Sequence, residues 1–335
     1  MAGLVCVGRE LEFGEGSNSY RRFLVRNSDI NAEYEKLTIV AHNALVHYRS
    51  IPMQTVISFQ FDSNLRPQSQ KLIFTSFFGD PVEDEKFQLN LYDRWTEPLS
   101  FLTSYNANIN LSTFPIPLST QFLRSKLVGC YCNSIEMVFE PKEFATMSAT
   151  FICADIKALS TEHICDNMIE EFPICFHQVF VEIWHEQYEP VSPQDKQFFA
   201  VKTCNLQFTR GLDQDSFTAG ENKLNRVLIS KSATMTGEID VAFDHGVAND
   251  LFDKLVDNDD SSITGDATDV NNMYRKIRIY GVDSDDNELF YVLYDKAYIT
   301  GLKVGTSGLE PDHYKITFEA VVTNTHNVTV WIPQS

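Results

Sequence analysis

Hydrophobic and polar residues alternate with a period of two along most of this chain. Ile57, Phe59 and Phe61 would share one face of a strand. Ser58 and Gln60 would share the opposite face, which is typical of an antiparallel strand with one buried side. Further runs of this kind lie at 86–91, 127–139, 145–153, 176–184, 201–208, 235–243, 276–280, 289–294 and 314–322. The pattern therefore predicts a mainly β protein.

Helical patterns are few. Residues 67–79 begin at Pro67, carry an apolar face and end at Gly79, which predicts a short helix. A second helix is predicted at 247–256, where four apolar residues fall on one face. A third and weaker pattern covers 160–171.

The chain also matches itself in two alignments. The matched pairs are Met53 with Met235, Ile57 with Ile239, Phe59 with Val241, Phe61 with Phe243, Tyr131 with Tyr298, Ile135 with Leu302, Ala149 with Ile316, Phe151 with Phe318 and Cys153 with Ala320. In both copies a helical pattern follows the first strand. Any two β domains share some alternation by chance, but the matching order of elements favours a tandem duplication.

The repeat predicts two tandem β-sandwich or barrel domains, each with a short α-helix. We place the first domain at residues 1–155 and the second at 156–335. The boundary is drawn between 155 and 202 because prolines punctuate that stretch.

The acidic composition narrows the classes of partner. Among 335 residues, 46 Asp and Glu stand against 27 Lys and Arg, which gives a net charge of −19 and a pI near 4.7. A protein that grips nucleic acid needs clustered Lys and Arg, so we expect no specific nucleic-acid binding. No apolar run approaches the roughly 18 residues of a membrane helix, and residues 1–7 lack the basic start of a signal peptide. We expect no membrane association.

The 7 cysteines are odd in number, and most of them lie in alternating apolar runs. This placement predicts small buried side chains that stay reduced in a cytoplasm. A zinc site would draw on Cys165, Cys175, His177 and His185, but no CxxC spacing supports it. We therefore predict no metal site from these residues.

Two acidic stretches raise the alternative of a calcium loop. An EF-hand requires glycine at its sixth position, where the stretch beginning at Asp257 has Ser262 and the one beginning at Asp283 has Glu288. We predict an exposed loop for residues 257–272 and a hairpin turn for the second stretch, because charge runs are usually solvated.

No motif of a known catalytic chemistry is present. The sequence lacks a nucleophile elbow, a Walker loop, a dinucleotide-binding glycine pattern and HExxH. We predict neither an enzyme nor a cofactor, and an unrecognised hydrolase is the last alternative. Phe180, Trp184, His185 and Tyr188 leave open an aromatic ligand platform, although such residues more often pack the outer end of a strand.

Four segments, taken together in their order and spacing, carry a resemblance. They are 7–14 with a GxExxxG pattern, 129–137 with a GxxxNS pattern, 232–243 with a Thr-Gly step before an alternating strand, and the pair 297–302 and 314–320. Together they resemble the long, duplicated class of bacteriophage tail tube proteins. One departure is that Thr55 of the first copy stands where Gly237 stands in the second. The insertions at 80–85 and 160–171 are further departures.

The resemblance implies two tandem tail-tube-like domains and a structural function in the virion tail. Subunits made in the host bacterial cytoplasm would form rings, trimers with pseudo-sixfold symmetry or else hexamers, that stack into a hollow conduit for DNA. Tape measure, tail terminator and baseplate proteins would be partners. The alternatives are a baseplate hub or tail terminator ring of the same fold, and a monomeric tandem β-sandwich binding module.

Two sets of acidic residues are the candidate functional positions. The polar face of one strand, carrying Glu238, Asp240 and Asp244, is a candidate lumen wall that would repel DNA phosphates. Plain solvent exposure is the alternative for that face. The candidate inter-ring loop contains Asp257, Asp259, Asp260, Asp266 and Asp269. The N-terminal segment and residues 324–335 are further candidates for contacts between rings.

Overall fold

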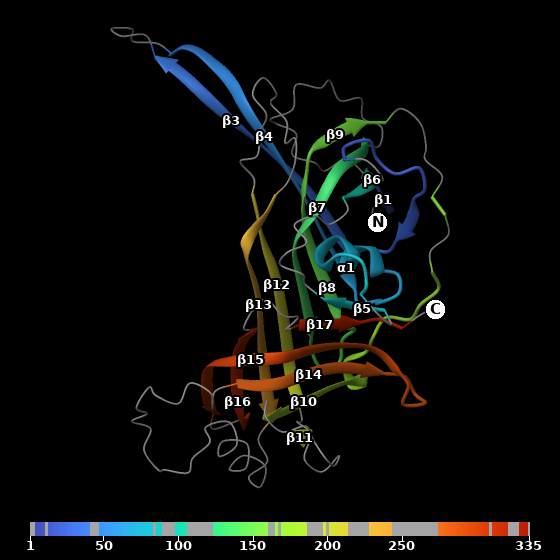
Figure 1. Ribbon diagram of the computed structural model, residues 1–335, viewed down its shortest axis with the longest axis vertical. Coiled ribbons are helices and arrows are strands. Elements are labelled where there is room, and N and C mark those ends of the chain that lie inside the picture. The colour runs from blue at the N-terminus through green and yellow to red at the C-terminus, as the bar shows by residue number, and fades with distance from the viewer. Residues whose placement is uncertain are drawn as a thin grey trace.

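The computed structural model describes residues 4–10, 13–40, 47–82, 85–88, 98–105, 123–159, 165–166, 169–185, 197–198, 201–213, 228–242, 274–307, 310–320 and 328–333. Strands make up most of these residues, so the prediction of a mainly β fold is confirmed (Figure 1). The part of the chain described here holds one α-helix.

The elements fall into two successive sets. The first is β1 (Leu4–Arg9), β2 (Arg21–Phe23), β3 (Asn27–Val40), β4 (His47–Asn64), α1 (Lys71–Phe78), β5 (Lys86–Gln88), β6 (Leu99–Tyr105), β7 (Leu123–Phe139), β8 (Thr146–Cys153) and β9 (Asp155–Ala158). The second is a 3-10 turn (Phe176–Gln178), β10 (Val179–His185), β11 (Gln197–Phe198), β12 (Val201–Asp213), β13 (Leu228–Ala242), β14 (Tyr274–Val282), β15 (Glu288–Ser307), β16 (Glu310–Ala320) and β17 (Val328–Trp331).

The described residues test two of the three predicted helices. Helix α1 forms where Pro67 and Gly79 bracket the pattern, and the Gly79 N–H donates to the carbonyl of Thr75 at its end. The prediction of a helix at 160–171 is wrong for the described residues there, because Asp166 pairs in parallel with Arg21 as an isolated bridge. The pattern at 247–256 lies outside the described residues.

The two sets of strands pair in the same order, always antiparallel. In the first set the pairs are β1–β2, β1–β6, β6–β7, β7–β8, β7–β9, β4–β8 and β3–β4. In the second set they are β10–β11, β10–β14, β14–β15, β15–β16, β15–β17, β13–β16 and β12–β13. The division between the sets falls between β9 and β10, within the stretch 155–202 in which the sequence places the boundary.

The register repeats as well, including a β-bulge. In the first set Tyr131 lies opposite Ile152, and the register shifts after Cys132. In the second set Tyr298 lies opposite Glu319, and the register shifts after Ile299. These positions correspond one to one under the alignment of Phe151 with Phe318.

The other alignment, of Met53 with Met235, is four residues out of register. Phe61 lies opposite Ala149 and Ile239 lies opposite Ile316, so Ile239 is the counterpart of Phe61 rather than of Ile57. A shift by an even number of residues keeps every side chain on its face, so the alternation alone could not detect the error.

The corrected register also explains Gly237, which is the counterpart of Phe59 and not of Thr55. Phe59 lies opposite Phe151, whereas Gly237 lies opposite Phe318. A Cβ added at Gly237 would lie 2.1 Å from the Phe318 ring. One aromatic ring therefore occupies in the second set the space that two aromatic rings occupy in the first set.

Gly237→Ala is expected to lower the free energy of unfolding by about 1 to 3 kcal/mol, because the new methyl must displace the Phe318 ring from a packed core. Urea unfolding at equilibrium measures the change. Thr234→Ala, at an exposed position of the same strand, is the matched control and should stay within about 0.5 kcal/mol of the parent. Equal stability of the two variants would contradict the packing argument.

One continuous sheet, here called the long sheet, joins the two sets. Its strands follow the order β3-β4-β8-β7-β12-β13-β16-β15, and the two sets meet where Cys204–Thr209 of β12 lie opposite Ser134–Phe139 of β7. In Figure 1 the distal part of the β3–β4 hairpin projects from the body of the molecule. The long sheet is thus two copies of a four-stranded unit.

Aromatic rings pack on the apolar face of the long sheet. Phe59 and Phe61 are fully buried, and the ring centroid of Phe59 lies 4.8 Å from that of Phe101. Phe151 also lies 4.8 Å from Phe101. Strand β6 therefore packs its side chains against the long sheet, and the two layers enclose the core of the first set.

A buried arginine joins the second set to α1. The Arg210 guanidinium, 2% exposed, donates to the backbone carbonyls of Ser76 at 3.4 Å and Phe77 at 2.5 Å. Burial lowers the pKa of Arg210 to about 10, so the side chain is still protonated at neutral pH. These carbonyls belong to the last turn of the helix, where cations are favoured.

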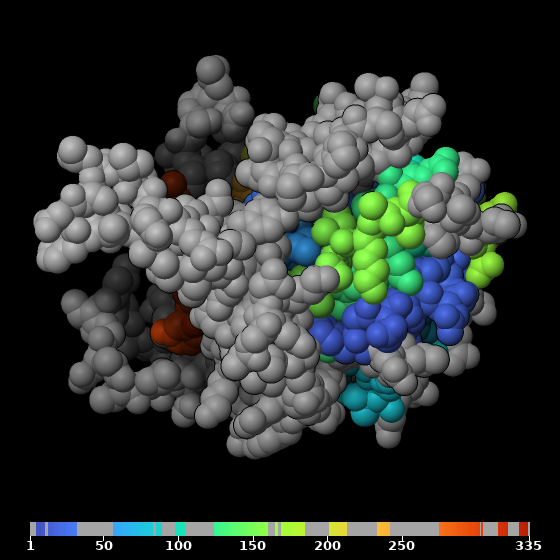
Figure 2. Space-filling view, turned by 90° about the horizontal axis from the view of Figure 1, so that it is seen from above, coloured from blue at the N-terminus to red at the C-terminus, as the bar shows by residue number. Residues whose placement is uncertain are grey.

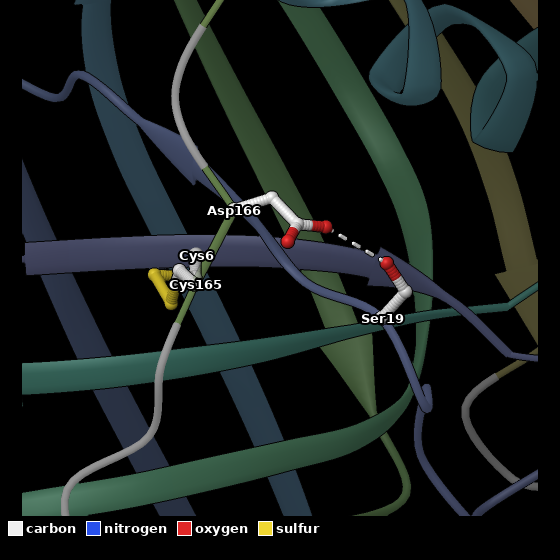
Figure 3. Close-up of a disulfide and its surroundings, with 4 residues drawn as sticks. All are labelled: Cys6, Ser19, Cys165 and Asp166. Atoms are coloured by element: carbon white, nitrogen blue, oxygen red, sulfur yellow. Dashed lines mark hydrogen bonds between the residues drawn. A yellow bond between two sulfur atoms is a disulfide. The ribbon is translucent and has the colours of Figure 1, made fainter.

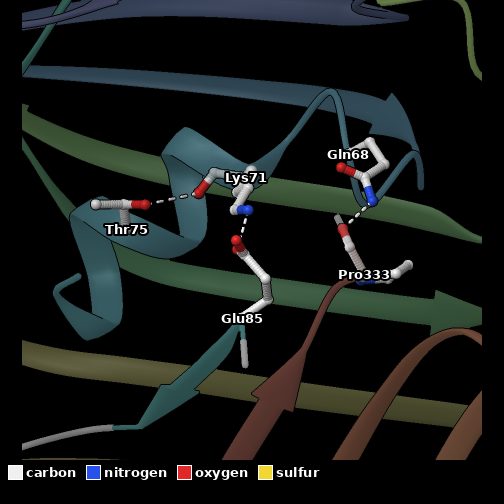
Figure 4. A network of polar contacts seen from close by, with 5 residues as sticks. All are labelled: Gln68, Lys71, Thr75, Glu85 and Pro333. Carbon is white, nitrogen blue, oxygen red and sulfur yellow. Dashed lines mark hydrogen bonds and ion pairs between the residues drawn. The ribbon is translucent and has the colours of Figure 1, made fainter. Parts of the chain in front are cut away.

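The C-terminal segment makes a second contact between the sets. Strand β17 pairs with β5, and the Gln68 side chain donates to the Pro333 carbonyl. Figure 4 shows this contact beside the ion pair of Lys71 with Glu85. The C-terminal segment of the second set therefore contacts β5 and the turn before α1 in the first set.

Cys6 and Cys165 form a disulfide, so the prediction that all cysteines are reduced is wrong for these two (Figure 3). Asp166 brings the second cysteine back to the N-terminal strands, because its N–H donates to Tyr20 and its carbonyl accepts from Arg22. The Ser19 hydroxyl donates to the Asp166 carboxylate at 3.1 Å. Among the free cysteines, Cys130, Cys132, Cys153 and Cys204 are buried as expected.

Candidate functional site

The long sheet presents one polar face, opposite its core. Residues directly across from each other on neighbouring strands share a face, so the face can be followed strand by strand. Its members with described side chains include Asp29, Gln60, Asp62, Ser148, Thr150, Ser134, Glu136, Thr203, Asn205, Gln207, Glu238, Asp240, Lys315, Thr317, Glu319 and Lys303. The polar face is continuous across both sets of strands.

Two of the three candidate lumen residues lie on the polar face. Glu238 lies opposite Thr317 and forms an ion pair with Lys315, and Asp240 lies opposite Lys315. Asp244 lies outside the described residues. The sequence therefore located the face, although it singled out one strand of a surface that spans the whole long sheet.

Among the polar-face residues whose side chains are described, acidic ones outnumber basic ones. The acids are Asp29, Asp62, Glu136, Glu238, Asp240 and Glu319, and the bases are Lys303 and Lys315. Such a surface carries a negative potential, which repels polyanions at short range. The alternation could not reveal this, because it does not say which strands are neighbours.

Neighbouring polar side chains on this face are bonded to one another. Asn205 Nδ2 donates to Glu136 Oε1 at 3.0 Å, across the junction between the two sets. The Ser148 hydroxyl donates to Asp62 Oδ1 at 2.7 Å within the first set. The polar face is therefore a surface of linked side chains as well as a charged one.

The acidic stretches have different outcomes. Asp257, Asp259, Asp260, Asp266 and Asp269 lie outside the described residues. Residues 283–287 form the predicted hairpin turn between β14 and β15. The Asp283 carboxylate accepts from Asn287 and from the Asp285 N–H, which lowers the pKa of Asp283 below its usual value. That carboxylate stabilises the turn itself.

The metal alternative finds no support in the described part of the chain, where no three His, Cys, Asp or Glu side chains gather as ligands. Cys165 is in the disulfide, and His177 lies in the 3-10 turn after Cys175. The side chain of His185 is outside the described set.

Two of the segments that carry the family resemblance meet at Glu10. This side chain is 1% exposed, and its carboxylate accepts from the Gly14 N–H at 2.9 Å and the Gly129 N–H at 3.0 Å. Both glycines have positive φ, 81° and 62°, which explains their place in the two patterns. Burial raises the pKa of Glu10, and the two backbone hydrogen bonds partly oppose that rise.

Strand β9 lies over the same region. In Figure 2 its yellow-green surface is beside the blue N-terminal segment. The Lys157 ammonium of β9 donates to the Gly14 carbonyl at 3.4 Å. The N-terminal loop is therefore fixed from both sides.

The Glu10 carboxyl is expected to make stability depend on pH. Because its folded pKa lies above the usual 4.5, its contribution is fully present below pH 4.5 and is lost as pH rises through the folded pKa. The free energy of unfolding of the parent relative to Glu10→Gln should therefore fall as pH rises above 4.5. Urea unfolding at several pH values measures this difference, and parallel curves would contradict it.

The aromatic cluster has different members from the predicted one. Phe180 and Trp184 lie on the same face of β10, whereas Tyr188 is outside the described residues. Phe180 instead stacks on Tyr280, and the Arg278 guanidinium lies 4.9 Å from the centre of the Tyr280 ring. The sequence missed this grouping because the rings come from separate strands.

Comparison of the chain with protein-family models and with curated protein sequences gives no match. Among the described helical residues, none form a segment of the length and apolarity needed to span a bilayer.

Proposed function

We propose that this protein is the major subunit of a bacteriophage tail tube, which forms stacked rings around a conduit for DNA. The observation that carries the proposal is the long sheet, whose two four-stranded units repeat in order and register and share one continuous acidic polar face. A sheet with one polar side and a covered apolar side can close into a ring with a hydrated lumen.

Closure supports the proposal on a second ground. A ring made from head-to-tail contacts removes the sheet edges that would otherwise aggregate. With two repeats in each chain, three chains supply six ring positions, so we propose a trimeric ring with pseudo-sixfold symmetry. The protein would then belong to the virion tail.

The acidic face suits a passage for DNA. Phosphates bind where Lys and Arg displace counterions, so a wall rich in carboxylates lets the genome slide without adhering. The polar face would line the lumen, with Glu238 and Asp240 among its residues. No catalytic step and no cofactor enter this function.

Negative-stain microscopy at high protein concentration, with light scattering on the same sample, tests the proposal. The expected result is hollow tubes or stacked rings, with a mass near three times 38.2 kDa for a single ring. Discrete single rings would favour a tail terminator or baseplate hub instead. A monomer at every salt and protein concentration would favour the tandem binding module.

A further inference from the structure

The junction between the two sets is a contact between repeats built into one chain. There β12 of the second set pairs with β7 of the first. Under the repeat in pairing, β3 is the counterpart of β12, and β15 is the counterpart of β7. The long sheet therefore ends in one strand of each kind that makes the junction.

Both terminal strands have an edge with no partner strand in the described part of the chain. There β3 pairs with β4 alone, and residues 301–307 of β15 pair with β16 alone. An exposed edge is a template for pairing with another strand. Because the two edges match a junction already made within the chain, the partner they fit is a second copy of it.

We propose that β3 of one copy pairs with β15 of the next, antiparallel and in the register of the β12–β7 junction. This inference rests on the proposed ring-forming function and specifies its subunit contact. Transferring the internal pairs position by position sets Ile30 opposite Val304, Ala32 opposite Leu302, Asn31 opposite Lys303 and Glu33 opposite Gly301.

This register keeps the two faces of the sheet distinct across the contact. Ile30 packs partly against the core, and the transferred register sets it opposite another apolar residue, Val304. Asn31 falls opposite Lys303, so polar positions also meet polar ones. A slip of one residue would set apolar positions against polar ones, which a sheet with one buried face does not tolerate.

The opposite charges of two side chains are a second, independent argument for this register. Inside the chain Asn205 donates to Glu136 diagonally across the junction. Their counterparts at the ends of the long sheet are Asp29 and Lys303, which carry opposite charges. Both side chains are exposed, and in the described part of the chain neither has an ion-pair partner. The internal hydrogen bond is thus replaced by an ion pair between copies.

Charge reversal tests this ion pair. Asp29→Lys and Lys303→Asp should each raise the protein concentration for half-maximal assembly roughly threefold or more, because like charges then face each other. The double variant D29K/K303D should restore the parent value. Sedimentation velocity measures assembly, and Glu319→Lys, elsewhere on the polar face, is the control for the change in net charge that Asp29→Lys makes. Singles that match the control, or a double no better than the singles, would overturn the register.

Cysteine cross-linking tests the register directly. In the variant N31C/K303C the two sites lie directly opposite, within disulfide reach. Oxidation should therefore give covalent dimers and trimers on non-reducing gels. In the control D29C/K303C one site is two residues out of register, a separation of roughly 7 to 8 Å that a disulfide does not span. The control should stay monomeric on the gel.

The two levels of the hypothesis fail differently. Rings or tubes formed by the parent chain, with no N31C/K303C cross-link and no effect of charge reversal, would overturn the register and leave the tube function standing. A parent chain that never self-associates would overturn both.

Discussion

Replacing Cys6 and Cys165 together by serine is expected to lower the free energy of unfolding by about 4 kcal/mol. The bond joins cysteines separated by 159 positions in the sequence, and the entropy that a cross-link removes from the unfolded chain grows with loop length. It also fixes the segment around Asp166 to the N-terminal strands. Urea unfolding under non-reducing and reducing conditions measures the effect.

The same experiment contains its controls. A reductant should bring the parent protein down to the stability of the double-serine variant and leave that variant unchanged. Cys175→Ser, at a free and half-buried cysteine, should behave as the parent does. If the reductant does not change the free energy of unfolding of the parent protein, the disulfide does not contribute to its stability.

Arg210→Ala is expected to lower the free energy of unfolding by about 3 to 5 kcal/mol, because it removes a large buried side chain and leaves two helix carbonyls without their hydrogen-bond donor. The loss should appear in thermal and urea unfolding, and it should loosen α1, since the guanidinium lies 5.6 Å from the centre of the Phe77 ring. Hydrogen exchange of the α1 amides measures that loosening.

Arg210→Met separates the two causes. Methionine keeps most of the buried volume but donates no hydrogen bond. The methionine variant should therefore lose roughly half as much free energy of unfolding as the alanine variant. Thr209→Ala, next in the chain on the polar face, is the matched control and should be near neutral. An alanine variant as stable as the parent would refute the structural role of the guanidinium.

The alternation of hydrophobic and polar residues predicted correctly on which face of a strand a side chain lies. It predicted poorly which residues pair across neighbouring strands. It located Glu238 and Asp240 on the polar side and Ile239 in the core, because the pleat fixes side-chain direction within a single strand. It misplaced the counterpart of Gly237, since a strand shifted by an even number of residues looks the same. Strands β1, β3 and β6 were not singled out, and their pairing depends on contacts far apart in the chain.

The buried arginine of β12 has a visible signal in the sequence. Arg210 continues the apolar face of Leu206 and Phe208, and an arginine at a core position of an alternating strand indicates a buried partner. The Cys6–Cys165 bond had no comparable signal, because the segment that returns Cys165 to β1 lacks any periodicity. Glu10 was noticed only as part of a pattern, and its glycine partners explain why that pattern exists.

In the proposed ring, the junction between β7 and β12 would also determine how assembly responds to dilution. A contact between two parts of one polypeptide forms at the effective concentration of a tethered pair, whatever the amount of protein present. In the proposed ring of three such chains, half of the contacts would therefore be made during folding. Ring formation then follows the third power of subunit concentration, where single-repeat subunits would require the sixth. A duplicated chain can nucleate rings while its copies are still scarce.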